Sequence, residues 1–196
     1  KTVSVAASTA PVISVANLQN LNCANANNGS ITINVTSGIQ PYSYQWTNNV
    51  SNSNSASNLA AGNYIVTVTD NAGCVVTSSN NITSPTAITI QTVSQQNVKC
   101  FGNNTGNINI AASGGTGTLS YLWSNGNTTS SVTSLTMGNY SVTVTDQNNC
   151  TKQQSFTITQ PASALSSSTT PVGTSCGLNN GSALAVPAGG TSPYKF

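Results

Sequence analysis

The sequence is nearly devoid of charge. Only six of its 196 residues carry a formal charge, four of them basic and two acidic, and histidine is absent. A typical globular protein has about 25% charged residues. The basic residues Lys1, Lys99, Lys152 and Lys195 stand alone, whereas proteins that neutralise phosphates cluster theirs. We therefore expect no nucleic-acid partner.

Long apolar runs are also lacking. No segment approaches the roughly 20 apolar residues that a helix needs to cross a bilayer, so we expect no membrane span in this sequence. The start at Lys1 has neither the basic nor the apolar region of a secretion signal. Both ends interrupt a recurring pattern, and we expect them to be cuts through a longer protein.

The pattern itself is a tandem repeat. Residues 62–74 read GNYIVTVTDNAGC, and residues 138–150, which lie 76 positions later (138 − 62), read GNYSVTVTDQNNC. Trp46 recurs as Trp123, and Leu59 recurs as Leu135, at the same step or one residue more. Such regularity argues against a disordered, low-complexity chain and favours an array of similar domains.

Apolar and polar residues alternate within each repeat, as they do in half-buried strands. The first repeat predicts strands at 30–37, 42–47 and 63–69, with Ile31, Ile33, Trp46 and Val66 facing inward. Short strands, Gly and Asn turns and no helical periodicity indicate an all-β fold. We predict tandem immunoglobulin-like β-sandwich domains of about 75 residues each, in a linear array.

A tyrosine-corner signature supports this prediction. Gly62 precedes Tyr64, and Gly138 precedes Tyr140, each at the start of an apolar strand. In such a corner the phenol hydroxyl bonds back to the preceding loop. Trp46 and Trp123 are the expected core tryptophans.

The prolines at the junctions set the expected boundaries. Residues 1–10 would close a preceding repeat, 11–84 and 85–160 would form two complete domains, and 161–196 would open a third, incomplete one. The third segment contains a cysteine, Cys176, whose partner we expect beyond Phe196.

The other four cysteines predict one disulfide within each domain. Pairing equivalent residues would join points a whole domain apart, and Cys74 with Cys100 would join the ends of strands that run away from each other. Cys23 with Cys74 and Cys100 with Cys150 remain, and both cysteines of a pair must then lie at the same end of the sandwich. Each bridge would close a loop of about 50 residues, add roughly 4 kcal/mol and imply an oxidising compartment.

The two acids, Asp70 and Asp146, occupy equivalent positions in the two repeats. One carboxylate per domain is too few for calcium, which takes 6 to 8 oxygen ligands. We expect each to accept backbone N–H bonds and fix a turn. Without histidine, an acidic pair or an activated nucleophile, we predict no enzyme activity, no metal site and no cofactor.

The whole motif resembles the SprB repeat. It runs from Cys23 to Pro85 through Asn-Asn-Gly-Ser-Ile, Pro-Tyr-Ser-Tyr-Gln-Trp, Leu-Ala-Ala-Gly-Asn-Tyr, Val-Thr-Val-Thr-Asp and Gly-Cys, and it recurs up to Pro161. In the second copy Thr118-Leu119 replaces Pro41-Tyr42. The resemblance implies giant surface proteins of gliding Bacteroidota, exported by type IX secretion and displayed as filaments or mobile adhesins.

The resemblance leaves two functional hypotheses. The first is a structural stalk of an extracellular cell-surface filament, in which neighbouring repeats of the same chain, or further copies of it, are the partners. The second is an adhesive module whose exposed Tyr, Asn and Thr side chains contact surface polysaccharide. A binding site should show aromatics that vary between copies, and Tyr42, which becomes Leu119, is the one hint of this.

Overall fold

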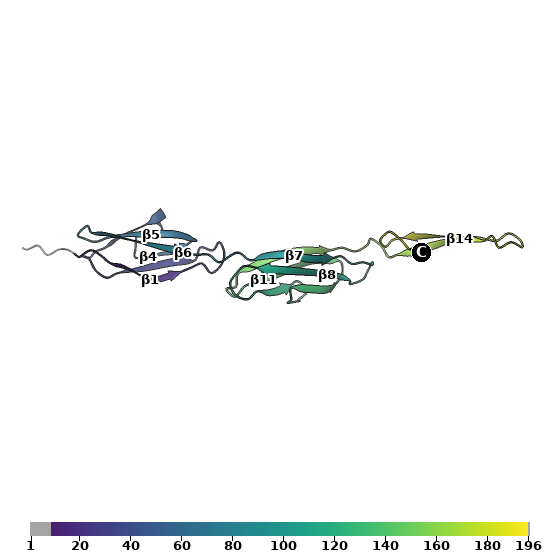
Figure 1. Ribbon diagram of the computed structural model, residues 1–196, viewed down its shortest axis with the longest axis horizontal. Coiled ribbons are helices and arrows are strands. Elements are labelled where there is room, and N and C mark those ends of the chain that lie inside the picture. Colours follow the sequence, from purple (N-terminus) through teal and green to yellow (C-terminus); the bar gives the residue numbers. More distant parts are fainter. Residues whose placement is uncertain (1–8, 196) are drawn as a thin grey trace, which may run out of the picture. The chain divides into compact units, whose positions relative to one another are not determined.

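The computed structural model describes residues 9–195, and strands dominate it (Figure 1). The chain forms two compact units. One contains residues up to Ala87 together with Gly114–Gly117 and Gln147–Cys150, and the other contains Ile88–Ser113, Thr118–Asp146 and the residues from Thr151 onward. The boundaries expected at 11–84, 85–160 and 161–196 stay predictions, and the segment 1–10 lies, except for Thr9 and Ala10, outside the described residues.

The first repeat is a six-stranded antiparallel sandwich. One sheet has the order β1-β2-β4 and the other has the order β3-β5-β6. The strands are β1 (Ile13–Gln19), β2 (Gly29–Val35), β3 (Ser43–Trp46), β4 (Ser55–Leu59), β5 (Gly62–Thr69) and β6 (Val75–Ile82), with a short 3-10 turn at Thr47–Asn49. These sheets correspond to strands A-B-E and C-F-G of an immunoglobulin domain without strand D. The all-β, immunoglobulin-like prediction is therefore confirmed.

Alternation along the strands builds the core of this repeat. Ile31 and Ile33 of β2, Trp46 of β3, and Val66 of β5 are at most 1% exposed, whereas Ile65, on the opposite face of β5, is 38% exposed. Inward and outward positions thus follow the period of two that a strand imposes. Burial of these branched and aromatic side chains is the main force that holds the two sheets together.

The second repeat follows the same plan. Its sheets have the orders β7-β8-β10 and β9-β11-β12. The strands are β7 (Thr89–Gln96), β8 (Gly106–Ser113), β9 (Ser120–Trp123), β10 (Ser131–Leu135), β11 (Gly138–Thr145) and β12 (Thr151–Ile158). Ile108, Trp123 and Val142 take the buried places of Ile31, Trp46 and Val66. Trp123 also packs against Phe156, with 5.6 Å between ring centroids.

The third segment contributes one hairpin, β13 (Ser166–Val172) with β14 (Ser182–Ala188). The hydroxyl of Tyr194 donates to the carbonyl of Gly189 at 2.6 Å, as that of Tyr42 does to Ser37 at 3.1 Å. Each of these tyrosines follows a cis proline, Pro193 or Pro41. The Pro-Tyr pair therefore forms the same local turn in the first and third segments.

Strands β3 and β4 together cross the sandwich once. Strand β3 runs antiparallel to β5, from Ser43 opposite Thr69 to Trp46 opposite Val66. Strand β4 then pairs with β2 in the other sheet and ends at Leu59, opposite Gly29. The segment between Trp46 and Leu59 holds one strand, and this strand continues the traverse that β3 began.

Candidate functional site: the disulfide and the aspartate turn

A disulfide joins the loop after β1 to the turn after β11. The sulfur atoms of Cys23 and Cys150 are 2.00 Å apart, the Cα atoms are 5.6 Å apart, and 127 positions separate the two residues in sequence. Both belong to the first compact unit, because that unit includes Gln147–Cys150. The bond therefore links the first repeat covalently to the second one at a point far along the chain from the peptide linker.

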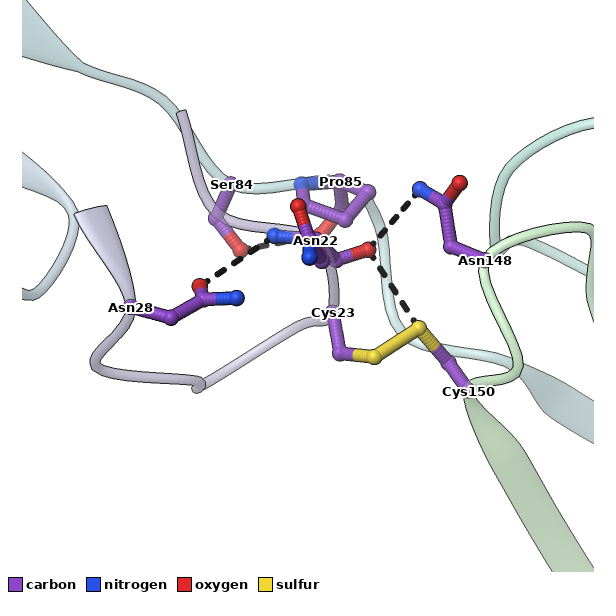
Figure 2. Close-up of a disulfide and its surroundings, with 7 residues drawn as sticks. All are labelled: Asn22, Cys23, Asn28, Ser84, Pro85, Asn148 and Cys150. Atoms are coloured by element: carbon purple, nitrogen blue, oxygen red, sulfur yellow. Dashed lines mark hydrogen bonds between the residues drawn. A yellow bond between two sulfur atoms is a disulfide. The ribbon is translucent and has the colours of Figure 1, made fainter. Parts of the chain in front are cut away.

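The backbone carbonyl of Asn22 organises the surroundings of this bond. The side-chain amide of Asn148 donates to it at 3.1 Å, and the Cys150 sulfur lies 3.3 Å from the same oxygen. Figure 2 shows both groups directed at this one atom. The Asn22 N–H in turn donates to the side-chain oxygen of Asn28 at 3.3 Å. The loop of Cys23 is thus held from both sides.

The pairing predicted from the sequence, Cys23 with Cys74 and Cys100 with Cys150, is not the pairing in the structure. Cys23 lies at the end of the sandwich where the N–H of Leu21 bonds to the carbonyl of Thr83. Cys74 lies at the other end of β5, where its carbonyl accepts the N–H of Asp70. Eight residues of strand span roughly 25 Å, whereas bridged Cα atoms lie within about 7 Å.

The error came from eliminating the other pairings, and the course of the strands shows why the predicted pairing fails. Four strands separate Cys23 from Cys74, and an even number of full crossings would have returned the chain to the same end. Because β3 and β4 share one crossing, the number of crossings is three. The elimination assumed that all four cysteines pair with one another. Under that assumption Cys23 can pair with Cys150 only if Cys74 pairs with Cys100, so rejecting the second pair also rejected the first.

The remaining cysteines lie in three places. Cys74 is half-buried in the turn between β5 and β6, the position that Cys150 holds in the second repeat. Cys100 follows β7, the position that Cys23 holds in the first, and Cys176 follows β13. Cys100 and Cys176 are exposed free thiols.

Asp70 ends strand β5 and closes the turn that follows. One carboxylate oxygen accepts the N–H groups of Ala72 and Cys74, both at 2.9 Å, and the other accepts the N–H of Ile39 at 3.1 Å. These bonds, the one from Ile39 first, lower the pKa of Asp70 below its ordinary value, although burial opposes them. Asp70 is 4% exposed and ties the loop before β3 to the turn after β5.

Asp146 occupies the equivalent position at the end of β11 and is also 4% exposed. The turn beside it repeats the first one: the N–H of Gln147 bonds to the carbonyl of Thr116 at 3.0 Å, as that of Asn71 bonds to Ile39 at 2.8 Å. Within residues 9–195, no three acidic, cysteine or histidine side chains gather as metal ligands would.

The corner tyrosines and the core tryptophans each donate to a backbone carbonyl of their own repeat. The hydroxyl of Tyr64 donates to the carbonyl of Ala60 at 3.2 Å, and that of Tyr140 donates to Thr136 at 3.1 Å. The indole N–H of Trp46 donates to the carbonyl of Ser53, and that of Trp123 donates to the carbonyl of Thr129, both at 2.8 Å.

The other signature residues lie at strand ends. Leu59 and Leu135, at the ends of β4 and β10, are buried, and Gly62 and Gly138 open β5 and β11.

Sequence reasoning missed one asparagine in each repeat that helps to close the sandwich. The side-chain oxygen of Asn20 accepts the N–H of Thr83 at 2.8 Å, and that of Asn97 accepts the N–H of Thr159 at 3.0 Å. These bonds join the end of the first strand of each repeat to the end of its last strand. The signal was present, because Asn20 and Asn97 recur at the 77-residue step (97 − 20) of Cys23 and Cys100.

Comparison with known protein families finds the same periodicity in this sequence. The sequence pattern of the SprB repeat matches residues 15–51 and again residues 92–128, a step of 77 positions (92 − 15). The chain thus matches the SprB repeat at two places. Each match covers the first half of a repeat, including the cysteine after the first strand and the core tryptophan. No curated protein matches the chain.

Several solved structures share a distant likeness. A C-terminal 282-residue fragment of intimin, solved with the intimin-binding domain of its translocated receptor, is 18% identical, with 76% of this chain and 67% of that chain covered and a TM-score of 0.39. The amphioxus IgVJ-C2 molecule is 16% identical, with 70% and 98% covered and a TM-score of 0.33. The Dpr2 Ig1-Ig2 complex with DIP-Theta is 10% identical, with 75% and 66% covered and a TM-score of 0.29.

SprB repeats occur in cell-surface proteins, and immunoglobulin-like repeats of this kind are typically structural modules without catalytic activity. The chain is thus a tandem repeat module of the cell-surface type, in which each repeat has neighbouring repeats as its partners. Among residues 9–195, no helix has the length and apolarity to cross a bilayer.

Proposed function

We propose that this chain is a segment of an extracellular stalk, in which each SprB repeat is a structural unit bonded covalently to the next. The observation that carries the proposal is the disulfide between Cys23 and Cys150. A stalk transmits force between its ends. A bond that joins successive repeats shortens the covalent path along which that force passes.

The bond removes most of the chain from the load path. Residues 24–149 lie inside the loop that the disulfide closes, so a pull on the two ends of the chain reaches them only after the bond is broken. A peptide chain extends by at most about 3.3–3.6 Å per residue. The 127 positions between the cysteines would otherwise release about 440 Å of length on unfolding.

Display outside the cell, where the oxidising conditions that disulfides need are found, is part of this proposal. So are export by type IX secretion and a role in adhesion or gliding, which the SprB repeats suggest. The alternative of a polysaccharide site at a variable tyrosine has less support. The hydroxyl of Tyr42 bonds to Ser37 within its own loop, and its half-buried ring packs on the core.

Single-molecule stretching of the whole chain tests the stalk directly. We expect the unreduced chain to reach full extension about 440 Å shorter than the reduced one. A Cys150→Ser variant should show the longer extension without reductant, and Cys100→Ser, the matched control, should behave as the parent chain. Equal extension before and after reduction would contradict the proposal. A glycan array with the same chain tests the alternative, which predicts binding that is lost in Tyr42→Phe.

A further inference from the structure

The loop that carries Cys23 recurs in the second repeat around Cys100. The carbonyl of Cys23 accepts the N–H of Ala26 at 3.2 Å, and the carbonyl of Cys100 accepts the N–H of Asn103 at 3.1 Å. Each cysteine therefore begins the same tight turn. Cys23 is bonded and half-buried, whereas Cys100 is free and exposed.

The anchors of the two loops match as well. The N–H of Leu21 bonds to the carbonyl of Thr83 at 3.0 Å, and the N–H of Val98 bonds to that of Thr159 at 2.9 Å. Since both loops are tied to the last strand of their repeat in the same way, the thiol of Cys100 is presented on its own repeat as the sulfur of Cys23 is on the first. Only the partner differs.

We propose that Cys100 is a cross-linking site for the turn cysteine of the repeat that follows it, as Cys23 is for Cys150. The partner is the turn cysteine, which lies four residues after the buried aspartate at the end of the fifth strand of a repeat. Cys74 follows Asp70 in this way, and Cys150 follows Asp146. The inference deepens the proposed stalk and rests on it in one respect, namely that such repeats follow one another in an oxidising compartment.

The chemistry is thiol–disulfide exchange. The Cys100 thiolate attacks a small disulfide such as oxidised glutathione, forms a mixed disulfide and releases one thiol. The thiolate of the turn cysteine then attacks the Cys100 sulfur and releases the second thiol. Two protein thiols lose two electrons and two protons, and the small disulfide, which is reduced to two thiols, takes up both.

The resulting disulfide loops would overlap. The loop closed by Cys23 and Cys150 contains Cys100, so a second loop that begins at Cys100 would share residues 100–150 with the first. No repeat would then be free to unfold and extend on its own.

A series of such cross-links also limits how far the repeats can stretch. From a turn cysteine to the next loop cysteine the chain covers 26 positions, from 74 to 100 and again from 150 to 176. A disulfide from that loop cysteine would lead to the repeat beyond. The shortest covalent path therefore uses 26 residues, about 90 Å at full extension, for every two repeats.

A chain with a completed third repeat tests this cross-link. Phe196 aligns with Tyr121, since Gly189-Gly190-Thr191 aligns with Gly114-Gly115-Thr116, so a copy of residues 122–160 is added after Phe196. Refolded in a glutathione redox buffer and mapped by mass spectrometry, it should contain Cys23 bonded to Cys150 and Cys100 bonded to the added copy of Cys150. In a Cys100→Ser control the added cysteine should remain a free thiol.

Two results would overturn the inference. One is a free Cys100 in an extended chain whose third repeat is folded, and the other is Cys100 bonded elsewhere. If the added segment does not fold, alkylation of the thiols of the original chain decides. Cys100 must then react without reductant, and Cys23 must react only after reduction. Protection of Cys100 from alkylation would refute the proposal. None of these results for Cys100 alters the stretching test of Cys23–Cys150, so failure of the two proposals is distinguishable.

Discussion

Asn148 donates its side-chain amide to the backbone carbonyl of Asn22, at 3.1 Å, beside the disulfide between Cys23 and Cys150. A residue of the second repeat thus bonds the backbone that positions a cysteine of the first. Through these two interactions, the stability of the first compact unit depends on a turn that the sequence supplies more than a hundred residues later.

Removal of the disulfide should destabilise the chain strongly. In the chain-entropy account, a loop of 127 residues contributes about 5 kcal/mol. For a chain of this size that corresponds to a fall in melting temperature of about 10–20 °C. We expect this fall in Cys150→Ser, measured by calorimetry without reductant. Cys176→Ser, which removes an exposed free thiol, should melt as the parent does, and an equal fall there would argue against the bond as the cause.

Asp70 should make stability depend on pH in the acid range. Its pKa is lowered in the folded protein, so its contribution is complete above the unfolded value of about 3.9 and is lost as the pH falls through the folded value. Asp70→Asn should be less stable at neutral pH and should lose less stability on acidification. Denaturant titrations between neutral and acid pH measure both effects. Lys152→Gln, a change at an exposed charge, should leave the loss of stability on acidification unchanged.

Gly106 should tolerate no side chain. A Cβ at this position would lie 2.9 Å from the side chain of Ile158 and 2.9 Å from the carbonyl of Leu135. Overpacking of this kind costs about 1–3 kcal/mol. Gly106→Ala should lower the denaturant midpoint accordingly, whereas Gly173→Ala, where a Cβ meets no atom within 4 Å, should be neutral. Similar midpoints for the two variants would show that the strands separate readily.

Loss of the corner hydroxyl should have a smaller effect. Tyr64→Phe removes the bond to the carbonyl of Ala60 and leaves the ring in place, at a cost of about 1 kcal/mol. Tyr140→Phe should cost about the same, since it loses the bond to Thr136. Tyr121→Phe, outside either corner, is the control, and urea denaturation followed by tryptophan fluorescence is the measurement.

The disulfide should also hold a cut chain together. A protease site inserted after Thr86, between β6 and β7, allows the peptide linker to be cleaved. Non-reducing electrophoresis should still show one species, because Cys23 and Cys150 lie on opposite sides of the cut. Two fragments should appear on reduction, and in Cys150→Ser they should appear without it. Separation of the unreduced parent chain would mean that the bond is absent in solution.

The sequence was sufficient for the fold of each repeat but not for the cysteine pairing. Ile31, Ile33 and Val66 were assigned inward from alternation alone, because a strand has only two faces and apolar residues need the buried one. Likewise, the Gly-to-Tyr spacing predicted a corner at Tyr64, whose hydroxyl bonds to the carbonyl of Ala60.

The pairing depended on a bend that alternation does not encode. After Trp46 the chain leaves one sheet for the other through a 3-10 turn, with Asn48 and Asn49 at φ values of +59° and +53°. Asparagine tolerates such a left-handed backbone, but its presence does not say which sheet the next strand joins. This one change of sheet places Cys74 at the far end from Cys23.

The long sequence span of the disulfide also sets an order of events. Cys23 is synthesised 127 residues ahead of Cys150, so the bond cannot close until nearly all of the second repeat has been made and its fifth strand has formed the turn. The first repeat therefore matures only after the second has been made, and a chain whose synthesis stops before Cys150 still carries Cys23 without its partner.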